Sequence, residues 1–180
     1  GTFLGKAFPE GGYTSYADLL LSAGKRYGVN PFILASKLIN EHGSSGNSGS
    51  VSGKVEGYEG YYNYFNIGAY AHSGRSAIEN GLIYAKEHGW DSREKSIMAG
   101  TEFFAKDYIR SNKTTAYFQK FNVMNGASAV ARGQYMTALW GANSTGETLG
   151  KGYASAYSSA LTFEIPVYLN MPTLPVPYPR

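Results

Sequence analysis

Residues 30–43 read NPFILASKLINEHG, and this stretch contains the start, the apolar face and the end of one helix. The Asn-Pro pair is typical of a helix N-terminus, because Asn caps the first turn and Pro fits the first helical position. The closing Gly is typical of a helix end. At about 100° per residue, Leu34 and Leu38 lie in a broad apolar arc, and Glu41 lies at its border. The stretch therefore predicts a helix over 31–42 with a carboxyl group at its C-terminal edge.

Glu41 has the features of a general acid. It lies in the last turn of the predicted helix, where the helix dipole disfavours a negative charge, and its border position predicts partial burial. Both effects favour the protonated carboxyl group that a general acid needs near neutral pH. Lys37, one turn earlier, allows the alternative that Glu41 belongs to a structural ion pair.

The composition indicates one folded domain and excludes several classes of protein. The 180 residues suit a single domain, and 43% hydrophobic with 16% charged residues argues against disorder driven by charge. The absence of Cys excludes disulfide frameworks, thiol catalysis and zinc ribbons. The net charge of +3 is too small to indicate nucleic-acid binding, and no apolar run approaches the roughly 20 residues of a membrane span. The 16 Tyr residues fit a groove that stacks on sugar rings.

The rest of the chain reads as mostly helical, with a small β component. Further helices are expected over 16–27, 73–88, 91–110, 128–141 and 146–160. The 73–88 helix is expected to be capped by Ser73, and the 91–110 helix to turn Phe104 and Tyr108 inward.

Two segments are expected to supply the β component. The Gly-rich stretch 43–60 predicts a loop with a short hairpin, and the alternation over 163–169 predicts an edge strand. The fold class is therefore α+β.

Four segments in order resemble one enzyme family. They are the helix 31–43 with its pattern L-A-S-x-x-x-x-E-x-G, the segment YNYFNIGA at 62–69, QYMT at 134–137 and FEIPVYLNMP at 163–172. Together they resemble the bacterial endo-β-N-acetylglucosaminidases of glycoside hydrolase family 73, over about residues 28–172.

The resemblance implies a lysozyme-like fold, with a helical lobe and a small β-hairpin region flanking a long cleft. It implies hydrolysis of the β-1,4 bond between N-acetylglucosamine and N-acetylmuramic acid in peptidoglycan. Glu41 would donate a proton to the glycosidic oxygen, and Tyr135 would lie near the reacting sugar.

The second catalytic group stays open at this point. Glu59 and Glu56, in the predicted hairpin, are candidates for a partner carboxylate, with Glu59 preferred. Glu79 follows the Tyr-Asn segment but falls on a predicted helix. The alternative is that the 2-acetamido group of the substrate attacks the anomeric carbon, with Tyr135 supporting the developing charge.

The Tyr-Asn segment is interpreted as substrate-binding, because its amides can hydrogen-bond sugar groups and its rings can stack. By alternation along the segment, Asn63 and Phe65 face one side, and the opposite side carries Tyr62, Tyr64 and Asn66. Only one of these two sets is expected to line the cleft. The predicted substrate-binding residues are Tyr62, Asn63, Tyr64, Phe65, Asn66 and Gln134.

No metal or cofactor is expected. His42, His72 and His88 do not have the spacing of a ligand set, and Glu41-His42 is not the zinc-protease pattern.

Residues 1–170 are interpreted as the catalytic domain and 171–180 as a Pro-rich linker. We expect a monomer, secreted and wall-associated, from a Gram-positive bacterium, with peptidoglycan glycan strands as its partner and wall-binding modules outside this segment. The alternatives are a muramidase or lytic transglycosylase on the same fold, and a non-catalytic peptidoglycan-binding module.

Overall fold

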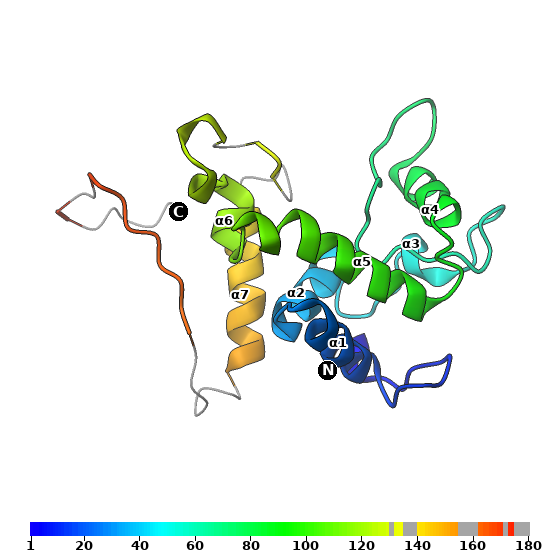
Figure 1. The fold of residues 1–180 in the computed structure, drawn as a ribbon. Coiled ribbons are helices and arrows are strands. Elements are labelled where there is room, and N and C mark those ends of the chain that lie inside the picture. Colours follow the sequence, from blue (N-terminus) through cyan, green and yellow to red (C-terminus); the bar gives the residue numbers. More distant parts are fainter. Residues whose placement is uncertain (130–131, 135–139, 155–161, 171–172, 175–180) are drawn as a thin grey trace.

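Helices form the frame of the chain in the computed structural model, which describes residues 1–129, 132–134, 140–154, 162–170 and 173–174 (Figure 1). The α-helices are α1 (Tyr16–Tyr27), α2 (Pro31–His42), α3 (Gly49–Ser52), α4 (Ala77–Glu87), α5 (Arg93–Asp107), α6 (Ala116–Phe121) and α7 (Gly141–Tyr153). Short 3-10 turns are η1 (Phe3–Gly5), η2 (Ile109–Ser111), η3 (Val123–Asn125) and η4 (Ala127–Ala129).

Local interactions fix the ends of α1 and α2. Ser15 Oγ accepts a hydrogen bond from the Asp18 N–H at 3.2 Å, and Asn30 Oδ1 accepts one from the Phe32 N–H at 2.9 Å. Gly28 ends α1 at φ 71°, and Gly43 ends α2 at φ 69°, a region in which glycine pays no steric penalty. Both predicted helices are therefore confirmed.

The second helix lies at the centre of the packing. It contacts α1 on one side and α7 on another, while α1 also contacts α5 and α7 contacts α6 (Figure 1). Leu34 and Leu38 of α2 are fully buried, as are Leu19 of α1 and Ile97 of α5. This apolar core holds the C-terminal end of α2 in a fixed place.

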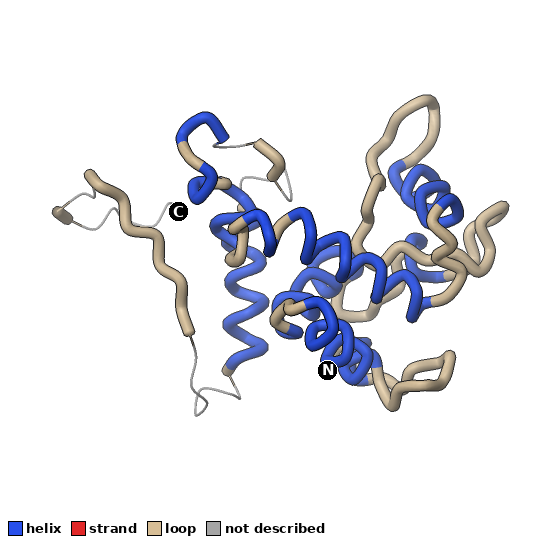
Figure 2. The backbone as a smooth tube through the Cα atoms, in the orientation of Figure 1, coloured by secondary structure: helices blue, strands red, loops and turns tan. Residues whose placement is uncertain are grey.

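The prediction of β structure in segments 43–60 and 163–169 is wrong. Among the described residues Figure 2 shows helices and loops without strands, and the only β pairings are isolated bridges at Ala7–Ser15 and His72–Arg75. Residues 49–52 form α3 instead of a hairpin arm, and Gly53, Gly57 and Gly60 all take positive φ, so the chain turns repeatedly after it. Residues 162–168 are largely exposed and pair with no strand in the part of the chain that the structure describes.

Two helix caps differ from the prediction, one by three residues and the other by one residue. Ser73 has φ 54°, which is incompatible with the extended backbone of a cap, and Ser76 caps α4 through a capping box with Glu79. Ser92 caps α5, one residue after the predicted start.

The C-terminal helices are less completely described. The predicted 146–160 helix overlaps α7, which begins earlier. Half of the predicted 128–141 helix lies outside the described residues, and within the described half residues 132–134 are not helical. Most of the Pro-rich 171–180 segment also lies outside them. None of the described helices is long and apolar enough to span a membrane.

Candidate active site

A pocket of about 360 Å³ opens at the C-terminal end of α2. It lies between that helix end, the segment 65–69 and one face of α5. Its lining consists of Glu41, residues 65–69, Gly100, Phe103, Phe104 and Tyr108. One carboxyl group and several aromatic rings therefore share a single concave site.

Glu41 is held by a neighbour from the Tyr-Asn segment. The Asn66 side-chain amide donates a hydrogen bond from Nδ2 to Glu41 Oε2 at 2.8 Å, and Glu41 is partly exposed. Asn66 takes φ 49°, a left-handed conformation that Asn tolerates better than most residues. Because Oε2 accepts this bond, a proton on the acid form of Glu41 belongs on Oε1.

Asn63 fixes the turn that carries Asn66. Its side chain is fully buried, and Nδ2 donates to the carbonyl oxygens of Ile67 and Gly81, both at 2.8 Å. Its Oδ1 accepts from the Ile67 N–H at 3.0 Å. Since Gly81 belongs to α4, Asn63 both closes the turn and fastens it to that helix.

His42 ties the end of α2 to the same segment. Its Nε2 lies 2.9 Å from the Tyr64 carbonyl oxygen, which can only accept, so Nε2 carries the hydrogen. Its Nδ1 then accepts from the Ser48 hydroxyl at 2.7 Å. Burial lowers the pKa of His42, against the smaller opposing effects of the Tyr64 carbonyl and the Glu41 charge. A neutral imidazole thus acts as a structural brace beside Glu41.

This brace predicts a pH-dependent stability. Because the pKa of His42 lies below 6.5 when folded, its contribution is complete above pH 6.5 and is lost as the pH falls through the lowered pKa. When the pH is lowered from about 7.5 to about 5, the melting temperature should therefore fall less for His42→Gln than for wild type. The exposed His72→Gln should behave like wild type; equal pH slopes in all three proteins would contradict the assignment.

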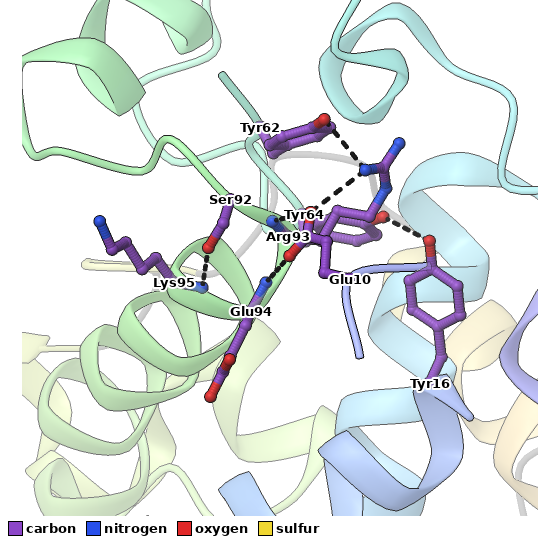
Figure 3. A network of polar contacts seen from close by, with 8 residues as sticks. All are labelled: Glu10, Tyr16, Tyr62, Tyr64, Ser92, Arg93, Glu94 and Lys95. Carbon is purple, nitrogen blue, oxygen red and sulfur yellow. Dashed lines mark hydrogen bonds and ion pairs between the residues drawn. The ribbon is translucent and has the colours of Figure 1, made fainter. Parts of the chain in front are cut away.

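A network behind the segment holds its tyrosines in place (Figure 3). Arg93 Nη1 donates to Glu10 Oε1 at 3.1 Å and to the Tyr62 hydroxyl at 3.0 Å, and its guanidinium carbon lies 4.4 Å from the Tyr62 ring centroid. The Tyr64 hydroxyl donates to that of Tyr16 at 3.2 Å. The N-terminal segment, α1 and α5 thus support residues 62–64 from the side of the core.

The structure divides the predicted substrate-binding residues into two groups. Phe65 and Asn66 line the pocket, whereas Tyr62, Asn63 and Tyr64 are buried away from it. The expected alternation of faces is wrong, because the segment forms a turn and not a strand. Tyr62, Asn63 and Tyr64 therefore lie behind the pocket and support the residues that line it.

The other candidate acids lie outside the pocket. Glu56 and Glu59 are exposed in the turns after α3, and Glu79 Oε2 accepts from the Ser76 N–H at 2.8 Å in the capping box. That backbone hydrogen bond lowers the pKa of Glu79. Within the described residues, Glu41 is the only carboxylate that lines the pocket. Tyr135 lies outside the described residues, and Gln134 is partly exposed.

One wall of the pocket was not predicted from the sequence: it is formed by α5 and by Tyr108 directly after that helix. Phe104 and Tyr108 were expected to be core residues only, but their stacked rings line the pocket. Gly100 lets Phe65 approach α5, since a Cβ there would lie 2.2 Å from Phe65 Cδ2. A glycine inside a predicted helix was the available signal, because it costs helix stability and usually has a packing reason.

Lys37 lies behind this wall. It is 2% exposed, and its Nζ is 4.7 Å from the Phe104 ring centroid. Burial lowers the pKa of Lys37 to about 7, and the Glu41 charge partly opposes that effect. The Glu41 charge thus acts on Lys37, but the place of Glu41 in the pocket favours a chemical role for its carboxyl group.

The described residues contain no group of three or more His, Cys, Asp or Glu side chains that could hold a metal ion. The functional groups in the pocket are thus those of a carboxylic acid, an amide and aromatic rings.

The sequence of the chain is similar to part of a known bacterial protein. The chain is 32% identical over 150 residues to the bifunctional autolysin of Staphylococcus epidermidis, a match that covers 81% of this chain and 11% of the autolysin. No family model matches the chain.

Two solved Staphylococcus aureus structures also match. One is a catalytic glutamate-to-alanine mutant of autolysin E in complex with the disaccharide NAG-NAM, with a TM-score of 0.62 and 27% identity over 77% of this chain and 59% of that one. The other is glucosaminidase B, with a TM-score of 0.55 and 31% identity over 76% of this chain and 52% of that one.

These matches define a class of lysozyme-like glucosaminidase domains with a mostly helical frame. The chain belongs to the family of these autolysins and glucosaminidases, in agreement with the resemblance of its motifs to glycoside hydrolase family 73. The chain spans about a tenth of the length of the curated autolysins that it matches.

Proposed function

We propose that this chain hydrolyses the β-1,4 bond between N-acetylglucosamine and N-acetylmuramic acid in peptidoglycan. The observation that carries the proposal is Glu41, which lies in a concave aromatic site at the end of α2 and is oriented by Asn66 at 2.8 Å. The relative whose catalytic glutamate was replaced holds the NAG-NAM disaccharide, which supports the same substrate class here.

In the proposed reaction Glu41 acts first as an acid and then as a base. Its Oε1 proton passes to the glycosidic oxygen as the bond from that oxygen to the anomeric carbon breaks, which leaves Glu41 as a carboxylate. Water later attacks the anomeric carbon and returns a proton to Glu41. The Asn66 amide keeps Oε2 in place through both steps.

We infer that the 2-acetamido oxygen of the substrate attacks the anomeric carbon in the first step, as the glycosidic bond breaks, and forms a cyclic intermediate. In the second step water attacks the anomeric carbon, the bond from that carbon to the acetamido oxygen breaks, and the acetamido group is restored. A nucleophile or a water-activating base would have to be a second carboxylate within about 10 Å of the first. Among the described residues, no second carboxylate lines the pocket. Substrate assistance needs none, and Tyr135 remains our candidate for stabilising the cyclic intermediate.

This mechanism makes a prediction for the two exposed acids. Glu59→Gln and Glu56→Gln should each retain kcat within about threefold of wild type on oligosaccharides of alternating N-acetylglucosamine and N-acetylmuramic acid, because neither would take part in the chemistry. A fall in kcat of about a hundredfold or more for either variant, with an unchanged melting temperature, would instead identify the partner carboxylate.

The aromatic wall is proposed to bind the sugar rings. Phe65, Phe103 and Tyr108 present apolar faces to the pocket, against which pyranose rings can stack. Asn66 and Gln134 are proposed to hydrogen-bond hydroxyl or acetamido groups.

The cellular setting is also a proposal. We propose that residues 1–170 act as a catalytic module in a larger autolysin and that 171–180 link it to another module. The match to a small part of much longer autolysins supports this arrangement. We further propose a role in cell separation or wall turnover at the cell wall.

Turbidity clearing of purified cell walls tests the proposed activity against a purely binding role. Wild type should clear walls, whereas Glu41→Gln should bind them without clearing them. Equal binding by both proteins with no clearing by either would show a binding module.

A further inference from the structure

Lys113 contacts both Gly133 and Tyr108, two residues that lie far apart in the sequence. Its Nζ donates a hydrogen bond to the Gly133 carbonyl oxygen at 2.7 Å and lies 5.1 Å from the Tyr108 ring centroid. The residue is only 8% exposed. A buried ammonium is costly without such partners, so its contacts define where the side chain can lie.

Neighbouring side chains secure both ends of this contact. Gln119 Nε2 donates to the Lys113 carbonyl oxygen at 3.0 Å, which fixes the lysine backbone. Asn122 Nδ2 donates to the carbonyl oxygens of Ala129 and Arg132, at 2.9 and 2.8 Å. Lys113 and Asn122 thus hold the carbonyl groups that precede Gln134, and Gln119 fixes the backbone of Lys113.

Gly133 is shaped for this contact. It takes φ 56°, and a Cβ there would lie 3.1 Å from Lys113 Nζ. A side chain would therefore strain the backbone and crowd the ammonium.

We propose that Lys113 is a positioning residue that holds Gln134 next to Tyr108, so that residues 132–134 continue the glycan-binding surface beyond the Glu41 pocket. Tyr108 lines the pocket and contacts the lysine ammonium, and Gln134 directly follows the carbonyl that the lysine holds. The inference rests on the proposed function, since it concerns binding of the same glycan.

The test compares Lys113→Met, Lys113→Arg and Gly133→Ala with wild type, using short and long oligosaccharides of alternating N-acetylglucosamine and N-acetylmuramic acid. Met keeps most of the side-chain volume but removes the charge and the donor, so KM for the long substrate should rise at least about tenfold while kcat changes less than about threefold. Arg can still donate to the carbonyl and stack on the ring, and should restore most of the affinity. Gly133→Ala should raise KM in the same direction.

Two controls separate positioning from a general loss of structure. Lys106→Met removes an exposed lysine of α5 and should leave KM unchanged. Hydrogen exchange of the 126–129 and 132–134 amides should quicken in Lys113→Met while the α2 amides keep their protection, a readout that does not depend on activity.

An unchanged KM in Lys113→Met and Gly133→Ala, with active wild type, would overturn the inference. Equal losses for short and long substrates, or a loss that Lys113→Arg does not restore, would also overturn it. If wild type cleaves no glycan, the proposed function itself fails; unchanged hydrogen exchange in Lys113→Met then overturns the positioning role separately.

Discussion

Glu41→Gln is expected to lower kcat on peptidoglycan fragments by about 10²–10⁴-fold, the range that general acid catalysis contributes. Gln has nearly the same shape and can still accept the Asn66 hydrogen bond through its amide oxygen, but it cannot donate a proton to a leaving oxygen. KM should change little, because the aromatic wall and Asn66 stay in place.

A loss of activity in Glu41→Gln identifies a catalytic role only if the variant folds like wild type. Melting temperature and far-UV circular dichroism should match wild type, since Glu41 is partly exposed and the change is isosteric. Glu102→Gln, which alters an exposed acid on α5, should retain full activity as a matched control. A Glu41→Gln protein with at least a tenth of wild-type kcat would contradict the role of Glu41 as the acid.

Asn63→Ala is expected to have the largest effect on stability. The change leaves the Ile67 and Gly81 carbonyl groups and the Ile67 N–H without the partner that Asn63 supplies. Buried polar groups that lose their partners cost about 1–3 kcal/mol each, so a loss of roughly 3 kcal/mol is a conservative expectation. For a chain of this length that corresponds to a fall of about 10 °C in melting temperature.

Thermal unfolding measures this effect directly, and activity should fall with it because Asn66 sits on the turn that Asn63 closes. The exposed Asn47→Ala provides a control for the loss of an amide and should shift the melting temperature by less than about 1 °C. A similarly small shift for Asn63→Ala would show that the turn does not depend on its amide.

The parts of the fold that could be predicted are those that local chemistry determines. The α2 helix is specified by its own cap, apolar face and terminal glycine, so its bounds and the border position of Glu41 followed from residues 30–43 alone. The prediction of a hairpin was wrong because Gly-rich sequence indicates turns but does not show whether strands lie between them. Ser73 and Ser76 both suit a helix cap, and only the backbone conformation distinguishes them.

The site depends on contacts between residues far apart in sequence. Nothing near Gly100 shows that Phe65 will pack against it, and nothing near Asn63 shows that the amide will reach Gly81. An Asn in a motif with many Tyr residues suggests ligand binding as readily as support, and only burial separates the two. The position of Glu41 at the end of its helix could be predicted, whereas the pocket around it could not.

Reducing-end analysis by mass spectrometry, on peptidoglycan sacculi digested by wild type, tests the central proposal most directly. We expect new chain ends that carry reducing N-acetylglucosamine, and far fewer of them after the same digestion with Glu41→Gln. Ends that carry reducing or anhydro N-acetylmuramic acid would contradict it, because they come from cleavage of the other linkage in the strand.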